Sequence, residues 1–407
     1  MSNDAAILVT GAAGRLGGVG RDVVEILRSR NLPVRALVHR EDERADALRA
    51  MGAEVVVGDL TRGGDVTRAL AGCRRMYFGM SVSAPYLEAT VTAAAVARQR
   101  GDLEVFVNIS QMTVSQMSLT AMTDSPQQRQ HWLGEQVLNW SGLPVVHVRA
   151  TVFLQNFFFS DWAAESVSRD ATIRLPFGAG RTSPIDARDV AEVVAAVLAN
   201  PSGHIGKVYE LTGPRSQDMN GIANEYSDAL GRTITYVDVP LEQWRDQELR
   251  SRNLPDHVFE HLLTMARLHA DNRYDRLTHD VETITGRPAT SVRDFVANHP
   301  EVFGPGTPGG SAGSGLLSGF RETVADSLDL VPEPTRAEEG AIGPTNQVAH
   351  AVAMGQPKGA AGATHSLVPE KRGWPPMSCR PSQEQSRIPC LGIIAREGQV
   401  VKSGIHS

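Results

Sequence analysis

From Ile7 to Gly20 the chain reads ILVTGAAGRLGGVG, in which an apolar run is followed by three glycines at three-residue spacing. These are Gly11, Gly14 and Gly17, and a helical pattern opens at Val19, so the order predicts a strand, a tight turn and a helix. In such a turn the first glycine allows a sharp bend, the second lets the backbone approach a pyrophosphate, and the third lets the helix pack against the strand. The pattern predicts a dinucleotide site, and a strand-to-helix turn without a ligand is the alternative.

The composition is ordinary for a soluble globular protein: of 407 residues, 41% are hydrophobic and 21% charged. A formal charge of -6 provides no basic field for nucleic acid or an anionic membrane surface. No run reaches the ~18 apolar residues of a membrane span, and the N-terminus lacks a basic leader. We therefore expect a cytoplasmic protein that binds neither nucleic acid nor membrane. The cysteines are too few and too scattered for a disulfide framework or a zinc site, and they are Cys73, Cys379 and Cys390.

A second strand is predicted at Pro33–His39, after a helix at Arg21–Arg30, which completes a βαβ unit. A site specific for NAD would carry Asp or Glu at the end of that strand to bind the ribose 2′-hydroxyl. His39 and Arg40 stand there instead, and an arginine suits a 2′-phosphate. The sequence therefore favours NADP as cofactor, with NAD as the second candidate. A solvated loop charge is the alternative interpretation of Arg40, because the residues that follow it are also charged.

Strand and helix patterns alternate through the next part of the chain. Further strands are predicted at Glu54–Asp59, Cys73–Met80, Leu103–Ser110, Pro144–Arg149 and Lys207–Thr212. Helices are predicted between them, notably at Tyr86–Arg100, Pro126–Trp140 and Ala187–Ala199. This alternation predicts an α/β fold, a Rossmann-type doubly wound parallel sheet whose ligands bind at the carboxyl ends of the strands.

The domain organisation follows from changes in pattern and composition. Residues 1–303 are predicted to form one NAD(P)-binding domain with a small, mostly helical substrate lobe that contains a strand at Thr233–Val239. Its Rossmann core comprises about 5–155 and 185–213, and the interleaved lobe about 156–184 and 214–303. Residues 304–407 are rich in Gly, Pro, Ala and Ser and are predicted to be a disordered tail, because such a sequence buries too little apolar surface.

Several stretches together resemble the NmrA-like family of atypical short-chain dehydrogenases/reductases, over about residues 5–300. They are TGAAGRLG (10–17), VRALVHR (34–40), GDL (58–60), GEQVLNWSGL (134–143) and Arg149–Asn156. The resemblance implies a Rossmann domain with a C-terminal lobe, NAD(P) binding, and one of two functions. The first is the reduction of quinone-like or azo-type small molecules, and the second is redox sensing without turnover, in which the protein regulates a protein partner. The oligomeric state stays open.

The resemblance also implies which residues bind the cofactor. The pyrophosphate would lie against the glycine turn, formed by Thr10, Gly11, Ala12, Ala13, Gly14, Arg15, Leu16 and Gly17. Arg40 would bind the 2′-phosphate, while Asp59 and Leu60 would border the adenine. Met80 and Ser81 would lie on the ribose side. The nicotinamide would be bordered by Phe153, Leu154, Gln155 and Asn156.

The catalytic residue implied by the resemblance is His131. Many relatives carry a lysine four residues before the glutamate that is Glu135 here, and this chain has His131 at that position. A histidine titrates near neutrality and could deliver a proton or a hydrogen bond. An exposed helix histidine without a role is the alternative.

Ordinary short-chain dehydrogenases depend on a tyrosine and a lysine four residues apart. This chain lacks that pair in residues 1–303. Lys207 is the one lysine in residues 1–303, and Gly203 stands four residues before it. Alcohol oxidation and sugar epimerisation need a phenol with a lowered pKa, so the sequence argues against both. Hydride transfer to an electron-poor acceptor needs less assistance, which favours a reductase of quinone-like or other electrophilic aromatic molecules.

Three further patterns have competing interpretations. His257–His261 reads HVFEH and matches a zinc-hydrolase motif, but a solvated helix face that begins at Asp256 is favoured. Ser110 could orient a substrate, although a hydrogen bond at the strand end is favoured. Phe157–Phe159 could line a pocket for a flat aromatic substrate, although packing of the lobe is favoured.

Overall fold

The structure is a computed structural model, which describes residues 5–14 and 18–303. Three predicted cofactor residues, Arg15, Leu16 and Gly17, lie outside the described residues, and so does the predicted tail, 304–407. Within the described part of the chain, no helix is both long and apolar enough to cross a membrane.

The main sheet is parallel and has the strand order β3-β2-β1-β4-β5-β6-β8. Its strands are β1 (Ile7–Thr10), β2 (Val34–Val38), β3 (Glu54–Val57), β4 (Arg75–Phe78), β5 (Val105–Gln111), β6 (Val145–Ala150) and β8 (Val208–Leu211). The order reverses between β1 and β4, which creates the crevice in which doubly wound folds bind their ligands. The predicted Rossmann-type α/β class is confirmed, and the strand ends differ from the predicted ones by at most two residues.

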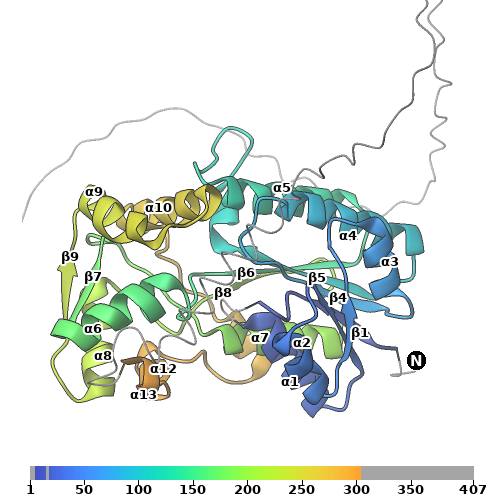
Figure 1. Ribbon diagram of the computed structural model, residues 1–407, viewed down its shortest axis with the longest axis horizontal. Helices are drawn as coiled ribbons and strands as arrows, with labels where there is room; N and C mark the ends of the chain where they lie inside the picture. Colours follow the sequence, from blue (N-terminus) through green and yellow to red (C-terminus); the bar gives the residue numbers. More distant parts are fainter. Residues whose placement is uncertain (1–4, 15–17, 304–407) are drawn as a thin grey trace, which may run out of the picture. The chain divides into compact units, whose positions relative to one another are not determined.

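Helices cover both faces of this sheet, as Figure 1 shows. One face carries α1 (Val19–Ser29), α2 (Glu43–Ala50), α7 (Ala187–Ala199) and α11 (Asp280–Thr285). The other carries α3 (Gly63–Leu70), α4 (Tyr86–Arg100) and α5 (Pro126–Trp140). Side chains alternate along a strand, so β1 contributes Ile7 and Val9 to the first core and Leu8 to the second. Burial on both faces explains why this strand reads as a continuous apolar run.

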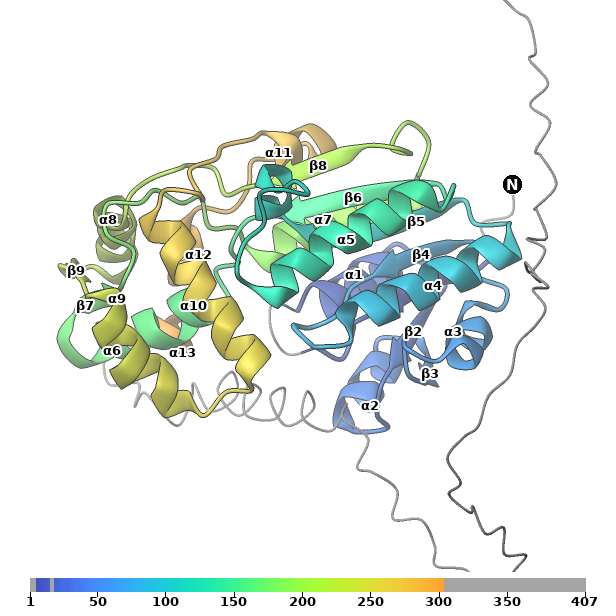
Figure 2. The same cartoon turned by 90° about the horizontal axis from the view of Figure 1, so that it is seen from above.

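A third hydrophobic core lies beside the main sheet and is formed by residues between Met112 and Phe303. A two-stranded parallel sheet joins β7 (Thr172–Leu175) to β9 (Thr235–Asp238). Around it lie η1 (Met112–Gln116), η2 (Phe158–Ala163), α6 (Ala164–Asp170), α8 (Met219–Leu230), α9 (Leu241–Trp244), η3 (Arg245–Leu249), η4 (Arg250–Arg252), α10 (Asp256–Ala270), α12 (Val292–Ala297) and α13 (Pro300–Phe303). Phe158 and Phe159 are fully buried in this core, which confirms that they pack rather than line a pocket. Figure 2 shows α10 beside the start of α5, where the third core meets the main sheet.

Candidate functional site

Two cavities lie at the carboxyl ends of the main-sheet strands. The larger has a volume of about 200 Å³ and the smaller about 140 Å³. Both are lined by Gly11, Gly14, Gly79, Met80 and Ser81. The larger extends to the ends of β5 and β6 and to α10, whereas the smaller extends to the ends of β2 and β3. The cavities therefore meet at the glycine turn, where this fold class binds a pyrophosphate.

The glycine turn is closely fitted to the end of β4. Gly11 has a φ of +69°, and a β-carbon on it would lie 2.6 Å from the carbonyl oxygen of Gly79. The Thr10 hydroxyl donates to that oxygen at 2.8 Å and accepts from the Gly79 N–H at 3.0 Å. Thr10 is thus fully buried and lines neither cavity, because its side chain joins β1 to β4. Ala12 likewise packs in the core instead of lining a cavity.

Gly14 lies where the two cavities meet and presents bare backbone to both. A β-carbon there would lie 3.2 Å from the Gly11 carbonyl oxygen and 3.5 Å from the Ser81 hydroxyl oxygen. Helix α1 begins at Val19, directly beyond the turn, and Gly20 packs so closely on Gly11 that a β-carbon would approach it to 2.8 Å. An open backbone and a helix N-terminus side by side fit the pyrophosphate of a dinucleotide. The close contact at Gly20 does not follow from the sequence pattern, which assigns that role to Gly17.

The smaller cavity carries two arginines on one side. Arg40 follows the end of β2, and Arg44 lies in the first turn of α2, where its Nε donates to Asp42 at 2.8 Å. Sequence reasoning missed Arg44 because it belongs to a charged run that reads as a solvated loop. On the other side are Asp59 and Leu60. The Asp59 carboxylate accepts from the Thr61 N–H and hydroxyl, both at 2.8 Å, so this loop is held in shape by its own hydrogen bonds.

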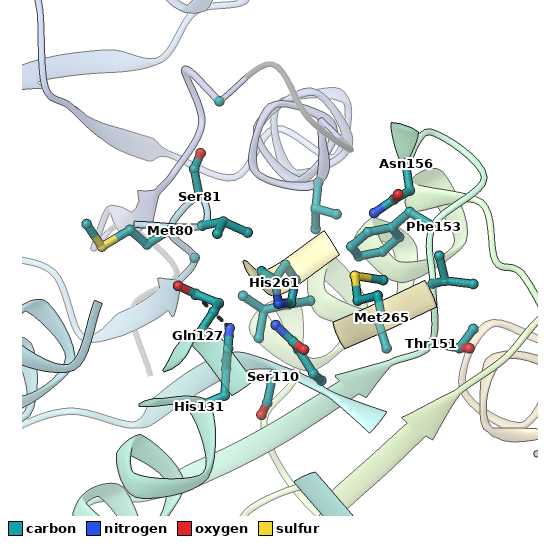
Figure 3. Close-up of a pocket in the computed structure, with 18 of the residues that line it drawn as sticks. Met80, Ser81, Ser110, Gln127, His131, Thr151, Phe153, Asn156, His261 and Met265 are labelled. Carbon is teal, nitrogen blue, oxygen red and sulfur yellow. Dashed lines mark hydrogen bonds between the residues drawn. The ribbon is translucent and has the colours of Figure 1, made fainter. Parts of the chain in front are cut away.

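The inner end of the larger cavity is apolar, as Figure 3 shows at Met265 and Phe153. Hydrophobic side chains from η1, from the segment after β6 and from α10 form its walls: Met112, Val152, Phe153, Phe157, Val258, Leu262 and Met265. Of the described residues that line this cavity, none is Asp, Glu, Lys or Arg. Such a cavity favours an uncharged, mainly apolar ligand.

The predicted nicotinamide border is only partly at the cavity. Phe153, Gln155 and Asn156 line it, but Leu154 is fully buried in the third core and lines neither cavity. The side chain of Leu154 packs in the third core and not at the cavity, which corrects the prediction for this residue. The Gln155 amide donates to Asp186 at 2.7 Å and accepts from the Ala187 N–H at 3.1 Å, so it also fixes the start of α7.

His131 lies on α5 at the wall of the larger cavity and is only 7% exposed, so the interpretation as an exposed helix histidine is wrong. Its Nε2 lies 3.2 Å from the Gln127 Nε2, and the Gln127 Oε1 accepts from the Ser83 N–H at 3.2 Å. The amide therefore donates to the imidazole. Burial, with His261 nearby as the second cause, lowers the pKa of His131 to about 3. His131 is neutral at pH 7, and the prediction that it titrates near neutrality is wrong.

His261, from the HVFEH stretch, lines the same cavity and is 5% exposed, so this part of α10 is not a solvated face. Its Nδ1 lies 3.0 Å from the Ser125 hydroxyl oxygen. Glu260 is exposed, and within the described ranges no three His, Cys, Asp or Glu side chains are grouped so that they could hold a metal. Asp256 is the first residue of α10 and not its cap, which is Pro255. A signal in the sequence could have shown the burial: His261, Met265 and His269 repeat at four-residue spacing beside apolar neighbours.

Ser110 lines the larger cavity, and its side chain does not form, with any described residue, the hydrogen bond expected at the end of the strand. It is 3% exposed, and its hydroxyl has no hydrogen-bond partner among residues 5–14 and 18–303. Thr113 and Thr151 line the same cavity, and their buried hydroxyls likewise have no hydrogen-bond partner among the described residues. The interpretation of Ser110 as a strand-end hydrogen-bonding residue is therefore wrong, and these side chains are available to a ligand.

Comparisons with known proteins agree with this arrangement. A curated relative, the NAD(P)H azoreductase of Xenophilus azovorans, is 29% identical over 300 residues, which cover 73% of this chain and 99% of the relative. Quinone oxidoreductase 2 of Escherichia coli is 26% identical over 262 residues, which cover 63% of this chain and 85% of the relative. The crystal structure of an NADPH-dependent quinone oxidoreductase from Escherichia coli, complexed with NADPH, is similar in fold. It superimposes with a TM-score of 0.61 at 22% identity and covers 72% of this chain and 99% of that one.

The family model described as the NmrA-like family matches residues 3–295. That match spans most of the chain and includes every element of both cavities. The resemblance stated from the sequence is thereby confirmed, and the chain belongs to the NmrA-like family.

Proposed function

We propose that this protein is an NAD(P)H-dependent reductase that transfers a hydride to a quinone-like or other electrophilic aromatic small molecule. The observation that carries the proposal is that the two cavities share the glycine turn as lining: a dinucleotide lying across Gly14 would extend its reactive ring into the larger cavity. The names of the relatives support it, because an azoreductase and a quinone oxidoreductase both reduce electron-poor acceptors.

The side chains at the cavity are suited to binding and orientation more than to acid–base chemistry. When bound, NADPH supplies the hydride. Burial raises the pKa of Tyr77, so this phenol remains protonated at neutral pH, and His131 is neutral. Met112, Phe153 and Leu262 exclude water and hold a flat acceptor. An acceptor that is already electron-poor requires little more than this, because orientation alone removes much of the barrier.

We further propose that NADPH is preferred to NADH, because Arg40 and Arg44 line the smaller cavity where the 2′-phosphate would lie. Replacing Arg40 with alanine should weaken NADPH binding by about ten- to a hundredfold, the effect of losing ~1.5–3 kcal/mol of charge-assisted hydrogen bonding. NADH binding should change little. Calorimetry on both cofactors measures this difference.

The matched control for that variant is Arg49→Ala, because Arg49 is an exposed residue of α2 that lines neither cavity. It should leave the affinity for both cofactors unchanged. Equal affinity of the wild-type protein for NADH and NADPH would contradict the preference.

A redox sensor is the alternative function, and a panel of quinones mixed with NADPH separates it from a reductase. A reductase consumes NADPH in proportion to the quinone added. A sensor leaves NADPH intact but binds NADPH and NADP⁺ unequally, because a ligand shifts a conformational equilibrium only through its differential affinity. Absence of turnover with every quinone, together with unequal binding, would favour the sensor.

A further inference from the structure

His261 is the polar side chain that α10 directs at the larger cavity, and the proposed hydride transfer does not yet use it. Figure 3 shows His261 at the cavity. The histidine lies on α10, beside the third core, and contacts the start of α5 through Ser125. It is 5% exposed and lines the cavity, and the hydrogen bond that the described residues give its ring is made at Nδ1, not at Nε2. A polar nitrogen in an apolar cavity is costly unless a ligand pairs with it.

The hydrogen bonds around Ser125 determine which nitrogen of His261 carries the proton. The Ser125 hydroxyl oxygen accepts from the Gln128 N–H at 3.3 Å, as the cap of α5. The hydroxyl proton also needs an acceptor, and of the two hydrogen-bond partners that the described residues give this oxygen only the Nδ1 of His261, at 3.0 Å, can accept, so we assign the hydroxyl as donor to Nδ1. An imidazole that accepts at Nδ1 and is neutral carries its proton on Nε2. Burial, with His257 as the second cause, lowers the pKa of His261 to about 4, so the ring is neutral at pH 7.

The Nε2–H of His261 can stabilise the negative charge that develops on the acceptor during hydride transfer. A hydride brings two electrons to the acceptor, so negative charge develops on an oxygen or nitrogen conjugated to the atom under attack, before water supplies the second proton. No charged side chain lines the cavity among the described residues, so a dipole has to stabilise that charge. A neutral imidazole donor does so without the cost of burying a cation.

We propose that the Nε2–H of His261 binds the substrate's acceptor atom, with Ser125 as the positioning residue that fixes the tautomer. The inference rests on the proposed reductase function and narrows its substrate class. The substrate is an uncharged, flat molecule that carries a carbonyl oxygen or an azo nitrogen conjugated to the atom that receives the hydride.

Two ligands of the same shape test this assignment without turnover. 1,4-Naphthoquinone has acceptor oxygens, and 1,4-dimethylnaphthalene has methyl groups in their place. Each is titrated calorimetrically into the full-length protein saturated with NADP⁺, which cannot donate a hydride, and the ratio of the two dissociation constants is compared among variants. His261→Leu should reduce the preference for the quinone roughly tenfold, the usual effect of one buried hydrogen bond. His261→Gln keeps a donor and should restore most of the preference.

Met265→Leu is the matched control, since Met265 lines the cavity one turn further along α10 and offers no donor. It should change the affinity for both ligands alike. Should the leucine variant not fold, His261→Met supplies the same test with a more flexible apolar side chain. An unchanged ratio in His261→Leu or His261→Met would overturn the assignment.

The outcomes also separate this inference from the proposed function. Consumption of NADPH by the wild-type protein with an unchanged ligand ratio in the variants would retain the reductase and reject His261. Selective binding of the quinone through His261, with no consumption of NADPH, would retain the binding site and reject the reductase.

Discussion

Replacing Gly14 with valine is expected to weaken NADPH binding by at least about a hundredfold, because the second glycine of such a turn is where backbone meets pyrophosphate. Gly14 lines both cavities and has no side chain to fill the place where they meet. The branched side chain would fill the junction. A β-carbon there would lie 3.2 Å from the Gly11 carbonyl oxygen, which is a tight contact, so the turn has to shift slightly and we expect the melting temperature to fall by a few degrees.

Two other glycines provide the comparison for this variant. Gly63, at the start of α3, has open space where a β-carbon would lie, with nothing within 4 Å, so Gly63→Ala should change neither stability nor binding. Gly11→Ala should instead lower stability itself, because its β-carbon would lie 2.6 Å from the Gly79 carbonyl oxygen at a φ of +69°. Calorimetric titration and thermal unfolding measure the effects separately. Wild-type affinity for NADPH in Gly14→Val would show that no pyrophosphate lies at the turn.

Replacing Arg149 with leucine is expected to lower the free energy of unfolding by ~3–5 kcal/mol, because it leaves a buried carboxylate without its partner. Glu135 on α5 is 1% exposed and receives two hydrogen bonds from Arg149 on β6, at 3.0 and 2.6 Å. Arg149 also lies 3.7 Å from Glu210 on β8, so the guanidinium connects two strands to a helix. Urea unfolding measures the loss.

A second substitution shows whether the orphaned charge is the cause. In the double variant Arg149→Leu, Glu135→Leu the buried carboxylate is gone, and much of the lost stability should return. Arg169→Leu is the matched control: its ion pair with Glu165 on α6 joins side chains that are 54% and 38% exposed, and its loss should cost less than ~1 kcal/mol. Equal losses in the single and double variants would mean that packing, not charge, explains the effect.

The parts of the fold with a local sequence signal could be predicted. The run that became β1 is apolar because both of its faces are buried, and the positive φ of Gly11 explains why glycine is required at the turn. Arg40 could be assigned to its cavity because strand ends in a parallel sheet share one edge.

The roles that depend on distant contacts could not be predicted. Gln127 acquires its role only because the backbone of Ser83, 44 residues away, fixes its amide. His131 looks isolated in the sequence, yet Gln127, His131, Glu135 and Leu138 form one buried face of α5 at helical spacing. That face is polar for most of its length, so an apolar pattern could not reveal it. His261 depends in the same way on Ser125, which lies 136 residues away.

A single-turnover experiment tests whether the protein transfers a hydride from NADPH to a quinone. The protein, saturated with NADPH, is mixed without oxygen with less than one equivalent of 1,4-naphthoquinone, and the reduced-nicotinamide absorbance is followed beside the formation of hydroquinone. We expect one NADPH to be oxidised for each quinone reduced, and we expect Gly14→Val to abolish the reaction at the same concentrations. A quinone that binds while all the bound NADPH remains reduced would contradict the proposed function.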